Sequence, residues 1–228
     1  MSDYDEMLKR LQAYRKSLGL KQRQICKTVG VTQEQYSYLE NGLVKLTDDN
    51  LKALYGIGLD LDYLITGKEY DYTAEDLDIL LSEFEESHKD FVMKMIAEVI
   101  VEKWSRGSLR QDMPEEALKN VHLLSAALQS WDRFSMVEFV REDSNFSQFD
   151  MMQKLGIGIK KYRALEKEER YPDAELLLNL YSMSGYPPAM FMNISDRRLL
   201  AIKTIWIMLK SKEKKDIIKV VKQLDKLV

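Results

Sequence analysis

Few of the residue types that carry out covalent or metal chemistry occur in this chain of 228 residues. It has two histidines, His88 and His122, and one cysteine, Cys26. A zinc-type site needs several His or Cys ligands together, so we expect no bound metal. Both histidines lie in helical surroundings without a catalytic motif. We therefore expect no catalytic residues, no cofactor and no enzymatic activity.

Residues 20–42, LKQRQICKTVGVTQEQYSYLENG, indicate a different chemistry. A first helix is expected from about 21 to 29, followed by a turn at Gly30, where a positive φ costs glycine little. Thr32 is a suitable N-cap for a second helix, and Gln35 completes a capping box. The apolar residues that bury one side of the two helices are Ile25, Val29, Val31, Tyr36 and Leu39. Cys26 is interpreted as a packing residue where the helices cross. The pattern predicts two short helices packed across a tight turn.

This segment, together with the later LKALYGIGLDLDYLITG, resembles the Xre/Cro family of phage-repressor-type helix-turn-helix domains. The resemblance covers about residues 5–68 and includes the GVT turn, LENG and LDYLITG in order. It implies that Arg15 of the first helix pairs with Glu40 of LENG as a buried structural pair. It also implies a transcriptional regulator whose third helix lies in the DNA major groove.

The resemblance assigns contacts with double-stranded DNA by position. The residues expected to face base edges are Thr32, Gln33, Glu34, Ser37 and Tyr38. Gln33 can pair with adenine through a donor and an acceptor, and Glu34 can accept from cytosine. Gln22, with the amides that begin the second helix, is expected to hold phosphate. Further phosphate contacts are expected from Lys21, Arg23, Asn41 and Lys45. Solvated surface side chains are the alternative for several of these residues.

The sequence also matches itself at an offset of 126 residues. Arg15, Gln22, Gly30, Tyr36 and Glu40 recur as Arg141, Gln148, Gly156, Tyr162 and Glu166. Apolar positions match in kind, for example Leu8 with Phe134. Any two small helical domains share apolar spacing, but not the matched Arg, Gln, Gly and Glu. We interpret this as a tandem duplication with a second structural pair, Arg141 and Glu166.

The second motif, FSQFDMMQKLGIGIKKYRALEKE at residues 146–168, departs from the first. Gly158 replaces the capping threonine, Ile159 replaces Gln33, and Lys167-Glu168 replaces the Asn-Gly that ends the helix. A possible second DNA-binding set is Gln148, Lys160, Lys161 and Arg163. The motif is either a second reading head, on half-sites about 34–36 Å apart, or a former head used for dimerisation or protein binding. Both interpretations remain open at this point.

Charge is distributed unevenly along the chain. Residues 70–129 have a net charge of −7 and residues 194–228 one of +6, within a total of −3. Both segments carry apolar residues at helical spacing, and a capping box from Thr73 to Asp76 is expected to open the acidic one. We expect the two segments to pack together, within a chain or across a dimer, with complementary charges at the rim. A solvated face, or a basic contact with DNA, is the alternative for the tail.

Together these patterns predict an all-α protein, a tandem duplication of repressor-like domains with helical extensions. The expected parts are 1–69, the DNA-binding domain; 70–129, an acidic extension and linker; 130–194, a degenerate second domain; and 195–228, a basic extension. We expect a sequence-specific regulator, a repressor, acting as a homodimer. The alternative is a protein-interaction module such as an antitoxin or adaptor. A small-molecule, peptide or protein effector is left open. One cysteine suits a reducing cytosol, and no apolar run reaches the ~20 residues that cross a bilayer. A cytoplasmic location without membrane contact is therefore expected.

Overall fold

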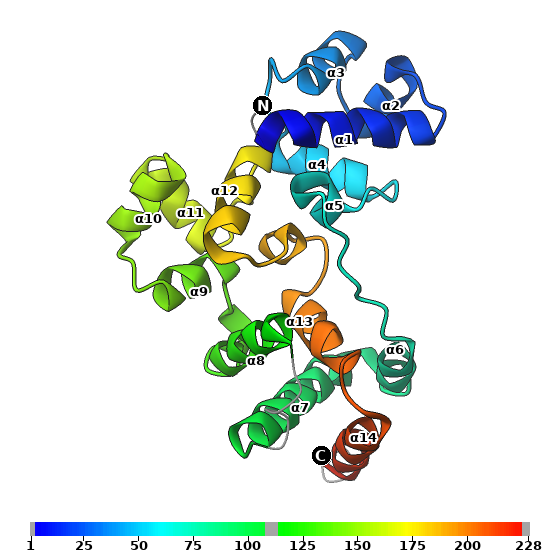
Figure 1. Ribbon diagram of the computed structural model, residues 1–228, viewed down its shortest axis with the longest axis vertical. Helices are drawn as coiled ribbons and strands as arrows, with labels where there is room; N and C mark the ends of the chain where they lie inside the picture. The colour runs from blue at the N-terminus through cyan, green and yellow to red at the C-terminus, as the bar shows by residue number, and fades with distance from the viewer. Residues whose placement is uncertain (1–2, 108–113, 225–228) are drawn as a thin grey trace. The chain divides into compact units, whose positions relative to one another are not determined.

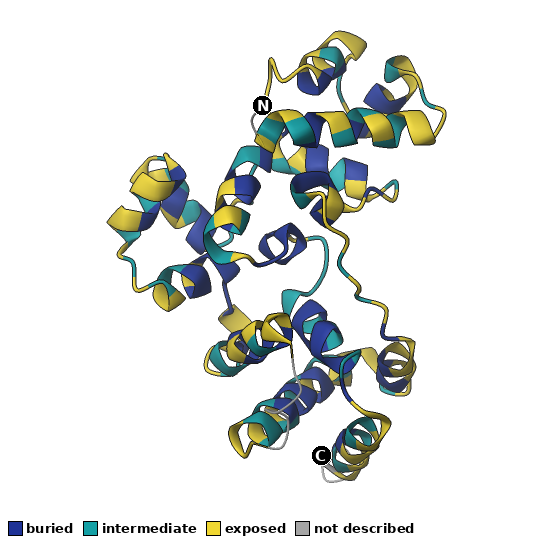
Figure 2. Ribbon diagram, in the orientation of Figure 1, coloured by how far each residue is buried: buried dark blue, intermediate teal, exposed yellow. Residues whose placement is uncertain are grey.

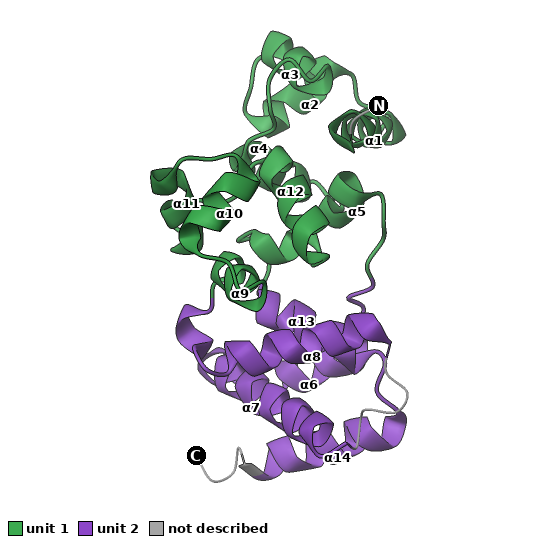
Figure 3. Cartoon of the chain, turned by 60° about the vertical axis from the view of Figure 1, so that its left-hand side comes forward, with its two compact units in different colours: residues 1–70, 135–195 green, residues 71–134, 196–228 purple. Residues whose placement is uncertain are grey.

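The computed structural model describes residues 3–107 and 114–224 (Figure 1). Every regular element in these ranges is a helix, so the predicted all-helical fold is confirmed for them. The chain forms two compact units, each built from two separate segments (Figure 3). Unit 1 comprises residues 1–70 and 135–195, and unit 2 comprises residues 71–134 and 196–228.

The first segment of unit 1 contains five helices. They are α1 (Asp3–Ser17), α2 (Gln22–Val29), α3 (Gln33–Glu40), α4 (Asp48–Tyr55) and α5 (Leu61–Thr66). Gly30 follows α2 with a φ of +75°, in the left-handed region expected at the turn. Thr32 Oγ1 accepts from the Gln35 amide at 3.1 Å, and Gln35 Oε1 accepts from the Thr32 amide at 2.9 Å. The predicted turn and capping box are therefore confirmed.

The core of this segment follows the predicted apolar spacing, except that Val31 is only partly buried. Ile25 and Tyr36 are fully buried, and Leu39 is 3% exposed. Burying such side chains stabilises the fold by about 1.5–3 kcal/mol each. Cys26 is also buried, as expected for a packing residue. Buried and exposed residues alternate along α1, whose apolar side faces the core (Figure 2).

The second segment of unit 1 repeats much of this order. It contains α9 (Met136–Asp143), α10 (Gln148–Leu155), α11 (Ile159–Glu166), α12 (Ala174–Ser184) and the 3-10 helix η2 (Pro188–Phe191). The helices α10, α11 and α12 begin 126 residues after α2, α3 and α4. Gly156 has a φ of +64° at the position that corresponds to Gly30.

Two positions differ between the segments. The helix α9 begins at Met136, after the 3-10 helix η1 (Trp131–Arg133). Ser135 caps α9, so Phe134 is extended and precedes the helix, whereas Leu8 lies inside α1; both side chains are buried and apolar, as expected. After α11, Glu168 adopts a φ of +57° where Gly42 has +71°. The backbone turn that ends the helix is thus kept without glycine, at a cost of roughly 1–2 kcal/mol.

The two segments of unit 1 pack on each other through α5, η2 and α12. Asp62 in α5 is 2% exposed, and its Oδ1 accepts from the Ala189 amide of η2 at 2.7 Å. The Ala174 amide, at the start of α12, donates to the Leu46 carbonyl at 3.0 Å. A buried carboxylate needs such donors because it has lost its water. These contacts join two segments that are far apart in the sequence.

Unit 2 brings the acidic segment and the basic tail together. Its helices are α6 (Glu75–Ser82), α7 (Glu86–Ser105), α8 (Glu115–Ala127), α13 (Arg197–Trp206) and α14 (Ser211–Leu224). The helix α13 packs on α8 and α7, and α14 packs on α7. Ion pairs join Lys203 to Asp78 at 2.8 Å and Lys222 to Glu83 at 2.5 Å. The predicted packing of the two segments is confirmed within one chain.

The expected capping box at the start of α6 is wrong. Ala74 is the N-cap residue and makes no side-chain capping bond. Asp76 instead contacts the basic tail. Its Oδ1 accepts a hydrogen bond from Trp206 Nε1 at 2.9 Å, and its Oδ2 accepts one from Lys214 Nζ at 2.9 Å. The linker expected between the halves falls mainly on residues 108–113, which lie outside the described residues.

Acid should weaken unit 2 through Asp76. Burial alone would raise the pKa of this carboxyl, but hydrogen bonds from Lys214 and Trp206 outweigh burial and lower the pKa. A carboxyl with a lowered folded-state pKa stabilises the fold above its unfolded pKa and loses that contribution as pH falls through the folded value. We expect Asp76→Asn to lower the free energy of unfolding at neutral pH, with a difference that shrinks from about pH 5 to about pH 2.

Tryptophan fluorescence during urea unfolding measures this effect selectively, because all three tryptophans of the chain lie in unit 2. Asp49→Asn, which alters an exposed carboxyl of unit 1, is the control and should leave the fluorescence transition unchanged. An Asp76→Asn difference that stays constant over the whole acid range would contradict the prediction.

Candidate nucleic-acid interface

A buried ion pair fixes the first helix-turn-helix. Arg15 Nε lies 2.6 Å from Glu40 Oε1, and Arg15 Nη2 lies 3.2 Å from Glu40 Oε2. The Glu40 side chain is only 2% exposed, and Arg15 also donates from Nη1 to the Leu20 carbonyl at 2.8 Å. Two parallel bonds between a guanidinium and a carboxylate fix orientation as well as distance. The pair holds the end of α1 against the end of α3.

Gln22 is a third member of this cluster. Its Nε2 donates to Glu40 Oε2 at 2.8 Å, so the side chain ties the start of α2 to α3. The sequence predicts only a phosphate contact for Gln22. Its structural contact could have been suspected from the repeat, which keeps the Arg, the Gln and the Glu together.

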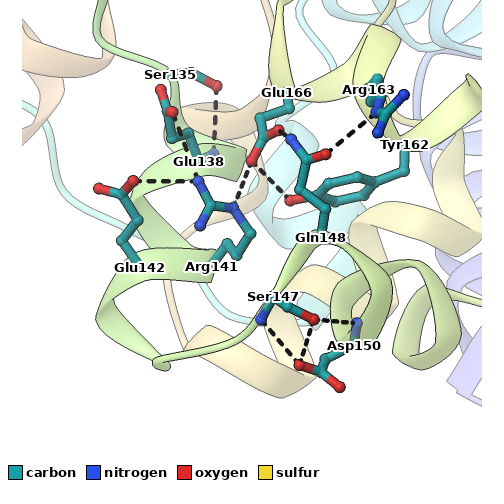
Figure 4. Close-up of polar contacts among 10 residues, drawn as sticks. All are labelled: Ser135, Glu138, Arg141, Glu142, Ser147, Gln148, Asp150, Tyr162, Arg163 and Glu166. Atoms are coloured by element: carbon teal, nitrogen blue, oxygen red, sulfur yellow. Dashed lines mark hydrogen bonds and ion pairs between the residues drawn. The ribbon is translucent and has the colours of Figure 1, made fainter. Parts of the chain in front are cut away.

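The same arrangement recurs in the second segment (Figure 4). Arg141 Nε donates to Glu166 Oε1 at 2.6 Å, and Gln148 Nε2 donates to Glu166 Oε2 at 2.5 Å. Tyr162 adds a hydroxyl bond to Glu166 Oε1 at 3.0 Å. Burial raises the pKa of Tyr162, and the Glu166 carboxylate raises it further, so the phenol stays protonated and donates. This cluster holds α9, α10 and α11 together.

The N-terminal end of α3 presents polar side chains to solvent. Thr32, Gln33 and Glu34 are exposed there, with Gln33 at the first helical position and Ser37 partly exposed one turn later. Tyr38 is 39% exposed, and its hydroxyl donates to Glu34 Oε1 at 2.7 Å. This hydrogen bond raises the pKa of Tyr38. Glu34 and Tyr38 are therefore bonded to each other in the free protein, and a carboxylate can accept further hydrogen bonds beside this one.

The expected phosphate contacts divide into two groups. Lys21 and Arg23 are exposed at the start of α2. Asn41 Nδ2 donates to the Ser37 carbonyl at 2.8 Å, at the end of α3. Lys45 forms an ion pair with Glu175 of α12. Both Asn41 and Lys45 thus have protein partners that a phosphate would have to replace, and the Glu175 contact could not be read from local sequence.

The expected second DNA-binding set is largely engaged within the protein. Lys161 Nζ pairs with Asp173 at 3.1 Å, and Arg163 Nε donates to Gln148 Oε1 at 3.2 Å. Lys160 is exposed on α11. Gly158, the N-cap residue of α11, makes no side-chain capping bond, as the sequence predicted.

The starts of α2 and α10 differ in charge. At α10, Asp150 Oδ2 accepts from the Ser147 amide at 2.9 Å and from its hydroxyl at 2.6 Å (Figure 4). Hydrogen bonds from the Ser147 side chain and backbone lower the pKa of Asp150, so this helix start carries a negative charge. At α2 the equivalent contact is neutral, from the Lys21 amide to Gln24 Oε1 at 2.8 Å. A helix start attracts phosphate only where no carboxylate already occupies it.

Comparison with known families gives one match to this region. Residues 11–54 match a family model described as helix-turn-helix. These residues form a helix-turn-helix of the phage-repressor type. The matched range includes all of α2 and α3, the C-terminal part of α1 and most of α4, and it supports a DNA-binding role for the domain. No curated protein and no solved structure matches the chain significantly.

Among the residues that the structure describes, no group of three or more His, Cys, Asp and Glu side chains is placed to hold a metal ion. No helix within residues 3–107 and 114–224 is long and apolar enough to span a membrane.

Arg15→Ala should destabilise the helix-turn-helix strongly. It leaves the buried Glu40 carboxylate without its charged partner, which typically costs about 3–5 kcal/mol. Urea unfolding followed by far-ultraviolet circular dichroism measures the loss, and tryptophan fluorescence of unit 2 serves as an internal reference. Lys16→Ala, the neighbouring exposed cation, is the control. A loss below about 1 kcal/mol would show that the pair is not the anchor described here.

Proposed function

We propose that this protein is a sequence-specific transcriptional regulator that reads the DNA major groove with α3. The observation that carries the proposal is the exposed polar start of α3, held rigid by its capping box and by the buried Glu40 cluster. A reading helix must be fixed in this way, because side chains that hydrogen-bond base edges tolerate little misplacement. The family match to residues 11–54 supports the same assignment.

In this proposal Gln33 pairs with adenine and Glu34 accepts from cytosine. Thr32, Ser37 and Tyr38 complete the base-facing set. Phosphates are held at the start of α2 and beyond the end of α3, where backbone contacts set the register on the duplex. The proposed phosphate-binding residues are Lys21, Gln22, Arg23, Asn41 and Lys45.

We further propose that unit 1 arose by tandem duplication of one repressor-like domain. Three successive helices begin at the same offset, and each segment has its own Arg–Glu–Gln cluster with similar distances. The proposed division is 1–69 and 130–194 for the two copies, with 70–129 and 195–228 as extensions. Repression would follow from occupying an operator as a homodimer, with a small-molecule, peptide or protein effector as a further possibility for control.

A protein-interaction module is the second candidate. It is favoured by Phe149 and Ile159, two apolar side chains exposed on the second helix-turn-helix at 59% and 38%. An antitoxin or adaptor built on this fold would use such a face and need no DNA.

Gln33→Ala should lower affinity for the preferred site by about 1–3 kcal/mol and relax specificity at one base pair, because it removes a paired contact with one base. Fluorescence anisotropy with the preferred duplex and with single-base variants measures both effects. Gln153→Ala, an exposed glutamine of α10, is the matched control. Equal weakening on random DNA would mean that Gln33 does not read a base.

Selection from a random duplex library at near-physiological salt tests the function itself. The salt must be fixed, because phosphate contacts make affinity steeply salt-dependent. The intact protein should enrich one motif or a palindrome, and a Lys160/Lys161/Arg163→Ala variant should enrich the same one. Two unlike half-sites, one lost in the variant, would make the second motif a reading head. No enrichment by either protein would favour the interaction module.

A further inference from the structure

The two helix-turn-helix copies present different chemistry at equivalent positions. Phe149 and Ile159 lie 126 residues after Arg23 and Gln33. In the first copy these positions are exposed and polar, at the start of α2 and of α3. In the second copy they are apolar and still exposed, by 59% and 38%. The helices α10 and α11 begin and end at positions equivalent to those of α2 and α3, 126 residues apart. The fold therefore does not require apolar residues at the positions of Phe149 and Ile159.

Electrostatics also separates this face of α10 and α11 from a DNA-binding surface. The Asp150 carboxylate occupies the start of α10 and would repel a phosphate. Of the three cations expected to bind DNA, Lys161 is paired with Asp173, and Arg163 is bonded to Gln148. Lys160, the third of these cations, is exposed on α11. The exposed residues at the starts of α10 and α11 thus include two apolar side chains, one acid and one base: Phe149, Ile159, Asp150 and Lys160.

We propose that this face binds the same face of a second copy of the chain. We call it the pairing face: Phe149, Asp150, Ile159 and Lys160. A two-fold axis makes every contact twice, so a dimer interface of this kind must be complementary to itself. The pairing face meets that condition, because its apolar side chains meet their equivalents and Asp150 of one copy meets Lys160 of the other.

The proposal rests on the proposed function for its biological meaning. Each chain then carries one reading head, in the first copy, and one pairing face, in the second. Two linked heads bind a palindrome more tightly than one head binds its half-site, because the second binding event becomes intramolecular. The duplication would thus have separated reading from pairing onto two copies of one fold.

The decisive variant is Phe149→Arg with Ile159→Gln. Both introduced residues are those that the first copy carries at the same positions, so the fold accommodates them. Analytical ultracentrifugation of the full chain should show a dimer for the wild type and a dissociation constant raised by roughly 100-fold or more for the variant. Leu43→Ser with Val44→Ser is the matched control, because it removes two exposed apolar side chains elsewhere in unit 1. This control should remain dimeric.

A monomeric wild type at about 100 µM, or a dimer as tight in the variant as in the wild type, overturns the proposal. A wild type that remains monomeric and binds a different protein through the pairing face also overturns the proposal. If circular dichroism shows that the double variant does not fold, Ile159→Gln alone serves as the test, with weaker dimerisation expected. Selection from the random duplex library separates the two proposals. A dimeric wild type that enriches no DNA sequence contradicts the proposed regulator but not the interface. A wild type that binds DNA as a monomer contradicts the interface alone.

Discussion

A buried carboxylate governs the geometry of each helix-turn-helix. Glu40 cannot remain charged in the interior without donors, and Arg15 and Gln22 supply them from two other helices. One side chain therefore fixes α1, α2 and α3 relative to one another. The direction in which α3 presents its first residues depends on this contact together with the buried Tyr36 and Leu39, because the helix is only eight residues long. Glu166 has the same role in the second copy.

Since the anchor is internal, the outer faces of the two copies have been free to differ. The first copy has polar and charged residues at the start of both outer helices, among them Arg23 and Glu34. The second places Asp150, Phe149 and Ile159 there, and its α11 lacks a side-chain cap. The fold survives these changes because none of them touches the Arg–Glu–Gln cluster. The fold and the surface chemistry of each copy are thus constrained separately in this protein. Two copies that share the fold can therefore have surfaces that bind different partners.

Local features could be predicted from the sequence, and long-range ones only in part. The bounds of α2 and α3 follow from Gly30 and Thr32, because capping depends on residues three or four apart. Packing of the basic tail on the acidic segment followed from charge and apolar spacing. The contacts of Lys45 with Glu175 and of Asp62 with Ala189 could not be foreseen, because they depend on how separately folded segments meet. The start of α9 was missed because a 3-10 turn interrupts the repeat.

The chain passes between its two units three times, after residues 70, 134 and 195. This has a consequence for the order in which the protein can be made. The first helix-turn-helix is complete once its own residues leave the ribosome, but α7 and α8 must wait for α13 and α14 before their apolar faces are covered. Unit 2 can therefore close only after α13 and α14 have left the ribosome. A polypeptide released before α13 would leave the apolar faces of α7 and α8 open to chaperones and proteases.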